Sequence, residues 1–309
     1  MNKEELISEE AATDRPAVNI SSVERDTGLS KDALRVWERR YGFPQPYRDA
    51  HGERIYPSDQ VDKLRLLKRL LDQGHRPSKV IHKSLEDLTA LCAEAETPTH
   101  SAEVESLLAL VRTHDSVQLR QTLTQILLRD GLRRFVVEVA VPLNRAVGNA
   151  WMRGEIAVFE EHLYTEQMQS LMRNAIASVQ LRGHSPRVLL TTLPTEQHGM
   201  GLLMVEALLT LEGVYCVPLG VETPATDIVA AALAHDVDIV ALSFSAAFPA
   251  RLATSSVREL RDLLPPEISL WVGGDGMLRA RTPGDGVEVL RSLEGVLGAL
   301  GEWRARLAD

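Results

Sequence analysis

The chain has only two cysteines, Cys92 and Cys216, among its 309 residues. Because each stands alone, they form neither a disulfide framework nor a Cys-x-x-Cys metal motif. Such sparse cysteine is typical of proteins in a reducing compartment. We therefore expect a cytoplasmic protein without disulfides and without thiolate metal sites.

Long apolar runs are also missing. No segment approaches the roughly 20 apolar residues that a transmembrane helix needs, and the first fifteen residues are polar and acidic, unlike a signal peptide. We therefore expect no membrane partner. Aromatic residues make up only 5% of the chain, but a hydrophobic fraction of 44% suffices for ordinary cores. The length favours two or three domains.

A net positive charge is absent overall, yet one segment is basic. Residues 31–83 contain 13 Lys or Arg against 7 Asp or Glu, a local charge of +6 in a chain whose net charge is −9. A basic segment on an otherwise acidic protein is typical of a surface that binds the phosphates of nucleic acid. The charge distribution therefore points to nucleic acid, although a solvated helical face would also be basic.

The basic segment carries the pattern of a helix-turn-helix. Ser21, followed by Glu24 three residues later, predicts a capped helix start. A turn around Gly28 follows, and Ser30 is expected to cap a second helix. Two short helices around a glycine-containing turn are typical of this motif.

The run Leu34-Arg35-Val36-Trp37-Glu38-Arg39-Arg40-Tyr41-Gly42 and the later Arg54-Ile55-Tyr56 are more specific. Together they closely resemble the winged-helix domain of MerR-family transcription regulators. The resemblance implies double-stranded operator DNA as partner and self-association as dimer or tetramer. It implies a DNA-binding surface that includes Arg35, Trp37, Arg39, Arg40, Tyr41, Arg54 and Tyr56, with core packing an equal alternative for Trp37.

Three short motifs follow three apolar runs in the second half of the chain. Glu196-Gln197-His198-Gly199-Met200-Gly201 comes after a run at 188–192, Ser243-Phe244-Ser245 ends a second, and Gly273-Gly274 ends a third. The runs read as buried parallel strands. Ligands of open α/β sheets bind at the carboxyl ends of such strands. Glu196 is close enough to hydrogen-bond His198, and a neutral imidazole is a metal ligand.

This series resembles the signature of the cobalamin-binding domain. In that family a histidine replaces the nucleotide base of vitamin B12 as the lower axial cobalt ligand. The resemblance implies His198 as the metal ligand and a cofactor-binding set that also includes Glu196, Gly201, Ser243, Ser245, Gly273 and Gly274. Ser245 departs from the family, which usually has Leu or Val there.

The middle of the chain is helical in pattern, with leucines recurring at helical spacing, and we expect a four-helix bundle. Within it Trp151 is followed after nine residues by Glu161-His162. This pattern resembles the light-dependent, adenosylcobalamin-using repressors of carotenoid genes. The resemblance implies adenosylcobalamin as cofactor and an upper-ligand pocket of Trp151, Glu161 and His162.

Position 152 is the main departure from those photoreceptors. They commonly have a histidine directly after the tryptophan, which takes the cobalt once light expels the adenosyl group. Here the residue is Met152, whose thioether is a weak donor compared with imidazole. Met152 therefore favours a light-independent regulator, whereas Trp151 and Glu161-His162 favour the photoreceptor.

We therefore expect a multidomain protein: a tail at 1–16, a MerR-type winged helix-turn-helix at 17–88, a linker at 89–101, a helical bundle at 102–182 and a Rossmann-like α/β domain at 186–309. The leading hypothesis is a non-enzymatic transcription repressor whose light-sensitive adenosylcobalamin controls oligomeric state and operator binding. Three alternatives stay open: a light-independent cobalamin sensor, a B12 domain used as a protein-interaction module, and a corrinoid methyl carrier.

Overall fold

The computed structural model describes residues 17–72, 75–94, 101–180, 185–278 and 284–308. The chain divides into two compact units. One comprises Met1–Thr99 with Gly148–Ala157, and the other comprises His100–Val147 with Val158–Asp309. The segment Gly148–Ala157, which belongs to the first unit, is thus the end of a helix and the turn after it.

The first unit is built from short helices around a small antiparallel sheet of strand order β1-β3-β2. In chain order its elements are β1 (Val18–Asn19), α1 (Ile20–Thr27), α2 (Lys31–Tyr41), β2 (Tyr47–Arg48), β3 (Arg54–Tyr56), α3 (Ser58–Asp72), α4 (Pro77–Val80) and α5 (Leu85–Glu94). The hairpin β2–β3 forms the wing, so the expected winged helix-turn-helix is confirmed.

Side-chain caps define where the first two helices begin. Asn19 caps α1, because its side chain accepts a hydrogen bond of 2.9 Å from the Ser22 N–H. The prediction that Ser21 is this cap was wrong by two residues, since an asparagine caps at least as well as a serine. Ser30 caps α2 as predicted, accepting from the Ala33 N–H at 3.2 Å.

The turn between α1 and α2 depends on a glycine and a carboxylate. Gly28 has a left-handed backbone with φ +67° and ends α1, a conformation that glycine adopts without steric cost. Glu24 accepts a hydrogen bond of 3.0 Å from the Lys31 N–H and lies 3.6 Å from its ammonium group. Glu24 therefore ties the two helices together instead of closing a capping box.

The second unit begins with the helical bundle. Its elements are α6 (Ala102–Arg112), α7 (Ser116–Arg134), a π-helical turn η1 (Phe135–Ala140), α8 (Val141–Met152) and α9 (Val158–Ala177). Gly131 interrupts α7 with φ +77° and ψ +162°, a kink that has an identifiable cause in the glycine.

A five-stranded, all-parallel sheet of order β5-β4-β6-β7-β8 forms the centre of this unit. Its strands are β4 (Arg187–Thr191), β5 (Tyr215–Gly220), β6 (Ile239–Ser243), β7 (Ser269–Gly273) and β8 (Val287–Leu290). Helices α10 (Met200–Leu211), α11 (Ala225–Ala234), α12 (Ala250–Leu263) and α13 (Leu293–Ala308) connect or follow them, with a short 3-10 turn η2 (Asp275–Met277).

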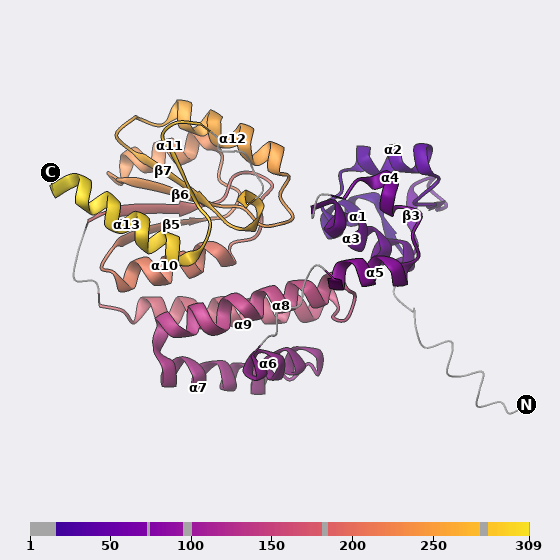
Figure 1. Ribbon diagram of the computed structural model, residues 1–309, viewed down its shortest axis with the longest axis horizontal. Coiled ribbons are helices and arrows are strands. Elements are labelled where there is room, and N and C mark those ends of the chain that lie inside the picture. Colours follow the sequence, from indigo (N-terminus) through magenta and orange to yellow (C-terminus); the bar gives the residue numbers. More distant parts are fainter. Residues whose placement is uncertain (1–16, 73–74, 95–100, 181–184, 279–283, 309) are drawn as a thin grey trace, which may run out of the picture. The chain divides into compact units, whose positions relative to one another are not determined.

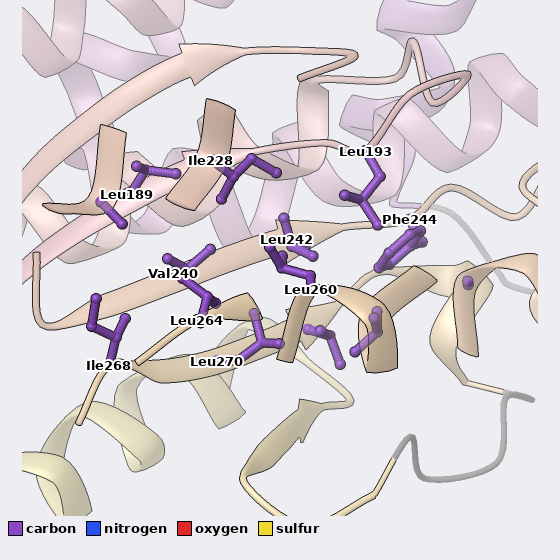
Figure 2. Packing of buried hydrophobic residues seen from close by; sticks show 14 of the residues in the cluster. Leu189, Leu193, Ile228, Val240, Leu242, Phe244, Leu260, Leu264, Ile268 and Leu270 are labelled. Atoms are coloured by element: carbon purple, nitrogen blue, oxygen red, sulfur yellow. The ribbon is translucent and has the colours of Figure 1, made fainter. Parts of the chain in front are cut away.

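Helices cover both faces of this sheet, which explains why its strands are nearly continuous apolar runs. Leu189, Val240 and Leu270 face α11 and α12, and Figure 2 shows this side of the core. Alternate strand residues such as Trp271 face α10 and α13. The expected Rossmann-like architecture is therefore confirmed.

The bundle packs on the sheet domain through α10, which contacts α7 and α9. Two ion pairs join the same parts: Arg133 with Glu212, and Arg145 with Asp275 at 3.3 Å. Asp275 directly follows Gly274, so the bundle is tied to a loop at the carboxyl end of the sheet. None of the helices in the described part of the chain combines the length and hydrophobicity that crossing a bilayer requires.

Candidate cofactor site and nucleic-acid interface

The three sequence motifs meet at one edge of the parallel sheet. The β4–α10 loop carries His198, Ser243 ends β6 and Gly273 ends β7. Because β4, β6 and β7 are neighbours in the sheet, their carboxyl ends lie side by side. Motifs that are far apart in the sequence thus form one continuous site.

The centre of the site is a hydrogen-bonded trio of Glu196, His198 and Ser245. The Nδ1 of His198 lies 2.6 Å from Glu196 Oε1, which also accepts the His198 N–H at 3.0 Å. Glu196 Oε2 accepts from the N–H and the hydroxyl of Ser245 at 2.8 and 2.9 Å. The Glu196 side chain is 1% exposed, whereas that of His198 is 64% exposed. A buried carboxylate therefore holds an imidazole that faces outward.

Electrostatics favour the charged forms of Glu196 and His198. Burial alone would raise the pKa of Glu196, but the hydrogen bond and charge of His198 and the Ser245 N–H outweigh it, so the pKa is lowered. The hydrogen bond to Glu196 raises the pKa of His198 against desolvation, and the Glu161 carboxylate adds to this rise. Glu161 on α9 is therefore near enough to act on the imidazole electrostatically.

The contacts of Ser245 show what a serine adds at a position where the family usually has Leu or Val. Both of its donors bind the second oxygen of Glu196, which Leu or Val could do only through the backbone N–H. The serine therefore adds one hydrogen bond to the carboxylate that orients His198.

Glycines line the site where backbone and side chains approach closely. A Cβ on Gly201 would lie 2.7 Å from the Ser243 hydroxyl, and a Cβ on Gly273 would lie 3.2 Å from the Leu290 carbonyl oxygen. Gly274 has φ +93°, and a Cβ there would collide with the Phe244 carbonyl oxygen. Gly274 therefore requires glycine, whereas at Gly201 the Ser243 hydroxyl could rotate away and at Gly273 a small shift would relieve the contact.

The predicted upper-ligand residues fall in different units. Glu161 and His162 lie on the first turn of α9 in the second unit, where His162 Nδ1 is 2.7 Å from Glu161 Oε2. Trp151 belongs to the first unit, where the Arg65 guanidinium lies 5.2 Å from its ring centroid. The shared role of these three stays a prediction, and the side chain of Met152 lies outside what the structure describes.

The donor set suits cobalamin. Because Nδ1 of His198 is occupied by Glu196, Nε2 is the nitrogen left for a metal. A single exposed imidazole is a poor cage for a free ion, but it is the one axial donor that a macrocycle-bound cobalt lacks.

Helix α2 presents exposed cations in the first unit. Arg35, Arg39 and Arg40 are all exposed. Arg35 pairs with Asp32 at 3.1 Å, and Arg40 lies over the Tyr41 ring at 5.3 Å from its centroid. Within the described residues Arg39 and Arg40 make no ion pair. Exposed, unpaired arginines on one helix can neutralise phosphates.

The wing is joined to α2 by a partly buried ion pair. Arg54 Nε donates to both oxygens of Glu38 at 3.1 and 3.2 Å, which raises the pKa of Arg54. A hollow of about 370 Å³ lies between helix and wing and is lined by Glu38, Gly42, Pro44, Gln45, Pro46, Arg48 and Arg54. Arg54 therefore positions the wing, and Arg48 of β2 is a cation at this surface that the sequence motifs did not single out.

Two residues of the predicted DNA surface are core residues instead. Trp37 is 7% exposed and Tyr56 is 0% exposed, and both pack in the hydrophobic core of the first unit. Burial raises the pKa of the Tyr56 phenol to about 12. Of the two roles left open for Trp37, the structure therefore favours packing, because the indole belongs to the same core as apolar residues of α1 and α3. Tyr41 is half-buried beside His82.

Comparison with protein families matches three parts of the chain. Residues 18–87 match the MerR HTH family of regulatory proteins. Residues 186–288 match the B12 binding domain, and residues 103–175 match a second B12 binding domain family that covers the bundle. The chain therefore combines a MerR-type module with a cobalamin-binding pair of domains.

Two curated relatives share this arrangement over most of their length. The chain is 32% identical over 255 residues to the HTH-type transcriptional repressor CarH of Myxococcus xanthus, covering 80% of this chain and 85% of that protein. It is 29% identical over 267 residues to the HTH-type transcriptional repressor CarA of the same organism, covering 84% and 87%.

Among solved structures, the monomethylamine corrinoid protein of Methanosarcina barkeri has a similar fold. Its TM-score is 0.50 at 16% identity, and the match covers 63% of this chain and 96% of that one. At this identity the likeness concerns the fold alone, and it supports the pairing of a helical bundle with a parallel sheet.

Proposed function

Because this chain belongs to the same family as the transcriptional repressor CarH, we propose that it is a repressor whose bound adenosylcobalamin controls self-association and thereby operator binding. The first unit binds double-stranded DNA and the second binds the cofactor. The protein acts in the cytoplasm as a regulator rather than as an enzyme.

The observation that carries this proposal is the Glu196–His198–Ser245 trio at the carboxyl edge of the sheet. His198 Nε2 would supply a nitrogen ligand to cobalt, and Glu196 fixes the tautomer that leaves this nitrogen free. A metal-binding imidazole must be neutral, and the hydrogen bond to Glu196 would keep its one remaining proton on Nδ1. Gly201, Ser243, Gly273 and Gly274, beside His198 at the same edge of the sheet, would contact the displaced nucleotide tail.

On the upper face, Trp151 covers the adenosyl group, and Glu161 and His162 hold it. When bound, adenosylcobalamin supplies a cobalt–carbon bond that light can break. Breaking this bond would change the set of residues that contact the cofactor. This change in contacts alters self-association of the protein.

Self-association raises DNA affinity by avidity. An assembly of two or four chains presents several copies of α2, so a second helix binds at a high effective concentration. A cofactor that binds the assembly more tightly than the monomer therefore stabilises operator binding by mass action. Arg35, Arg39 and Arg40 provide the contacts on each copy, and Arg54 holds the wing beside them.

One sequence observation favours a second candidate. Because Met152 stands where the photoreceptors have histidine, cobalt lacks a strong replacement ligand after photolysis. A light-independent cobalamin sensor of the same architecture accounts for this residue. In that case the presence of the cofactor, and not its photolysis, changes the assembly.

The test uses the full-length protein with adenosylcobalamin in darkness and after illumination. The molar mass in solution and the affinity for a double-stranded fragment selected by the protein from a random pool are measured in both states. A light-sensitive repressor loses mass and affinity together on illumination. A cobalamin sensor responds to the cofactor but not to light, and a protein whose mass and affinity ignore the cofactor contradicts both candidates.

A further inference from the structure

His114 lies in the turn between α6 and α7, and its side chain is 55% exposed. Its backbone is left-handed with φ +59°. The turn is closed by a hydrogen bond of 3.2 Å from the Asp115 N–H to the Leu110 carbonyl, and Asp115 caps α7. Histidine tolerates this conformation better than most residues do.

The His114 side chain reaches across to the first turn of α9. Its Nε2 lies 2.7 Å from Glu160 Oε1, and its ring lies 5.1 Å from that of Phe159, centroid to centroid. Glu160 is only 8% exposed. Because a buried carboxylate that loses a partner is costly, this contact holds the start of α9 to the turn.

Helix geometry passes this restraint to the next two residues. Successive side chains of an α-helix project about 100° apart, so a Glu160 fixed toward the bundle directs Glu161 and His162 away from it. Their side chains are 31% and 71% exposed. Glu161 is held further by the Thr165 hydroxyl at 2.7 Å. The rotation of this helical turn therefore decides where Glu161 and His162 point.

The surroundings of the contact are mixed, because leucines and a valine lie beside Ser116 and Tyr164. A small hollow of about 10 Å³ lies among residues of α6, α7 and α9, including His114, Glu160 and Tyr164, and it has room for roughly one water molecule. The buried Tyr164 hydroxyl has no hydrogen-bond partner among the described residues. The His114–Glu160 contact therefore adds a polar connection between the turn and α9 to the apolar packing of the same helices.

We propose that His114 is a positioning residue of the cofactor site, which acts through Glu160 to set the direction from which Glu161 and His162 meet the upper ligand of cobalamin. This inference rests on the proposed cofactor site. It assigns to the α6–α7 turn a role in selecting a cobalamin with a bulky upper ligand. The hydrogen bonds that hold His198 come from Glu196 and Ser245 and do not involve the α6–α7 turn.

The test compares two cofactor forms on the full-length protein in darkness. Adenosylcobalamin carries a bulky upper group, whereas hydroxocobalamin does not. The substitution His114→Asn keeps a residue that tolerates the left-handed turn but shortens the side chain. We expect it to weaken adenosylcobalamin binding on the order of tenfold and hydroxocobalamin binding less than about twofold. The exposed His235, which caps α11, provides the matched control His235→Asn, which should change neither.

A double variant tests whether His114 acts through its neighbours. If it does, His114→Asn added to His162→Gln should weaken adenosylcobalamin binding little beyond His162→Gln alone. Glu160→Gln keeps an oxygen that accepts from His114 and should keep the preference for the adenosyl form, whereas Glu160→Leu should lose it. These two variants provide the answer should His114→Asn fail to fold.

Equal weakening of both cofactor forms would show a merely structural role and overturn the proposal, as would full additivity with His162→Gln. If the wild-type protein binds both cofactor forms and His114→Asn binds them equally well, the positioning role alone is overturned. A wild-type protein that binds neither form overturns the cofactor site and the positioning role together.

Discussion

The candidate cofactor site and the exposed arginines of α2 are built in opposite ways. In the second unit, Glu196 accepts hydrogen bonds from both His198 and Ser245 and is almost fully buried. On α2, Arg39 and Arg40 are exposed and make no ion pair among the described residues. Buried networks respond cooperatively to the loss of one member, whereas separate exposed charges contribute small, nearly additive amounts. Substitutions in the two regions should therefore differ in size and in additivity.

The largest effect is expected at the strand end of the cofactor site. Gly274→Ala places a methyl group against the Phe244 carbonyl oxygen at a position with φ +93°, so we expect the second unit to lose at least about 2 kcal/mol of stability. Thermal or urea unfolding measures this loss. Gly298→Ala in α13 is the matched control, because a Cβ there meets nothing within 4 Å, and it should be neutral or slightly stabilising. Equal stability of the two variants would contradict the described strand-end packing.

Removing the charge of the buried Glu196 without changing its shape should have the next largest effect. Glu196→Gln removes the charge that holds His198 and should lower cobalamin affinity by about 10- to 100-fold, as for other residues that orient a metal ligand. Titration followed by visible absorption measures this affinity. Glu259→Gln, on the exposed side of α12, is the control for loss of charge. An affinity within twofold of wild type would mean that Glu196 does not orient the metal ligand.

On α2 we expect smaller and additive effects. Arg39→Ala and Arg40→Ala should each weaken binding to a selected double-stranded operator by roughly threefold to tenfold, and each should lower the slope of log affinity against log salt by about 1 for every phosphate that the arginine neutralises. Arg120→Ala removes an equal charge from α7 and should change neither quantity. A salt slope that stays at the wild-type value in the double variant would show that these arginines do not bind phosphates.

The fold was predictable from local patterns because strands and helices follow hydrophobic periodicity. The motif order also placed His198, Ser243 and Gly273 at strand ends, since parallel strands end at one edge of a sheet. Single contacts were harder to predict. Asn19 instead of Ser21 caps α1 because two good capping residues lie two positions apart.

Contacts between residues far apart in the chain could not be predicted from the sequence. The bond from Ser245 to Glu196 joins residues 49 positions apart, and it forms only because β4 and β6 are neighbours in the sheet. In the same way, Trp37 has the residue type of either a core or an interface residue, and only its burial decides. The contact of His114 with Glu160 depends on a left-handed turn that no sequence motif predicts.

The smallest effect is expected at Cys216. Burial raises the pKa of its thiol to about 12, so the reactive thiolate is scarce at pH 8 and should appear only as the pH rises toward that value. In a Cys92→Ser background, alkylation by iodoacetamide at pH 8 should be at least about 100-fold slower than that of a free thiol. Cys216→Ser should leave cobalamin affinity and DNA affinity unchanged. Rapid alkylation at pH 8 would show that this part of the second unit is open.

The central claim is that His198 ligates cobalt, and electron paramagnetic resonance of the protein loaded with Co(II) cobalamin tests it most directly. With histidines labelled by 15N, a protein imidazole at the axial position splits the cobalt lines into doublets, because 15N has nuclear spin one half. The account predicts doublets in the wild-type protein and their loss in His198→Ala. Triplets from unlabelled nitrogen would show that the cofactor keeps its own nucleotide base, and they would contradict the assignment of His198.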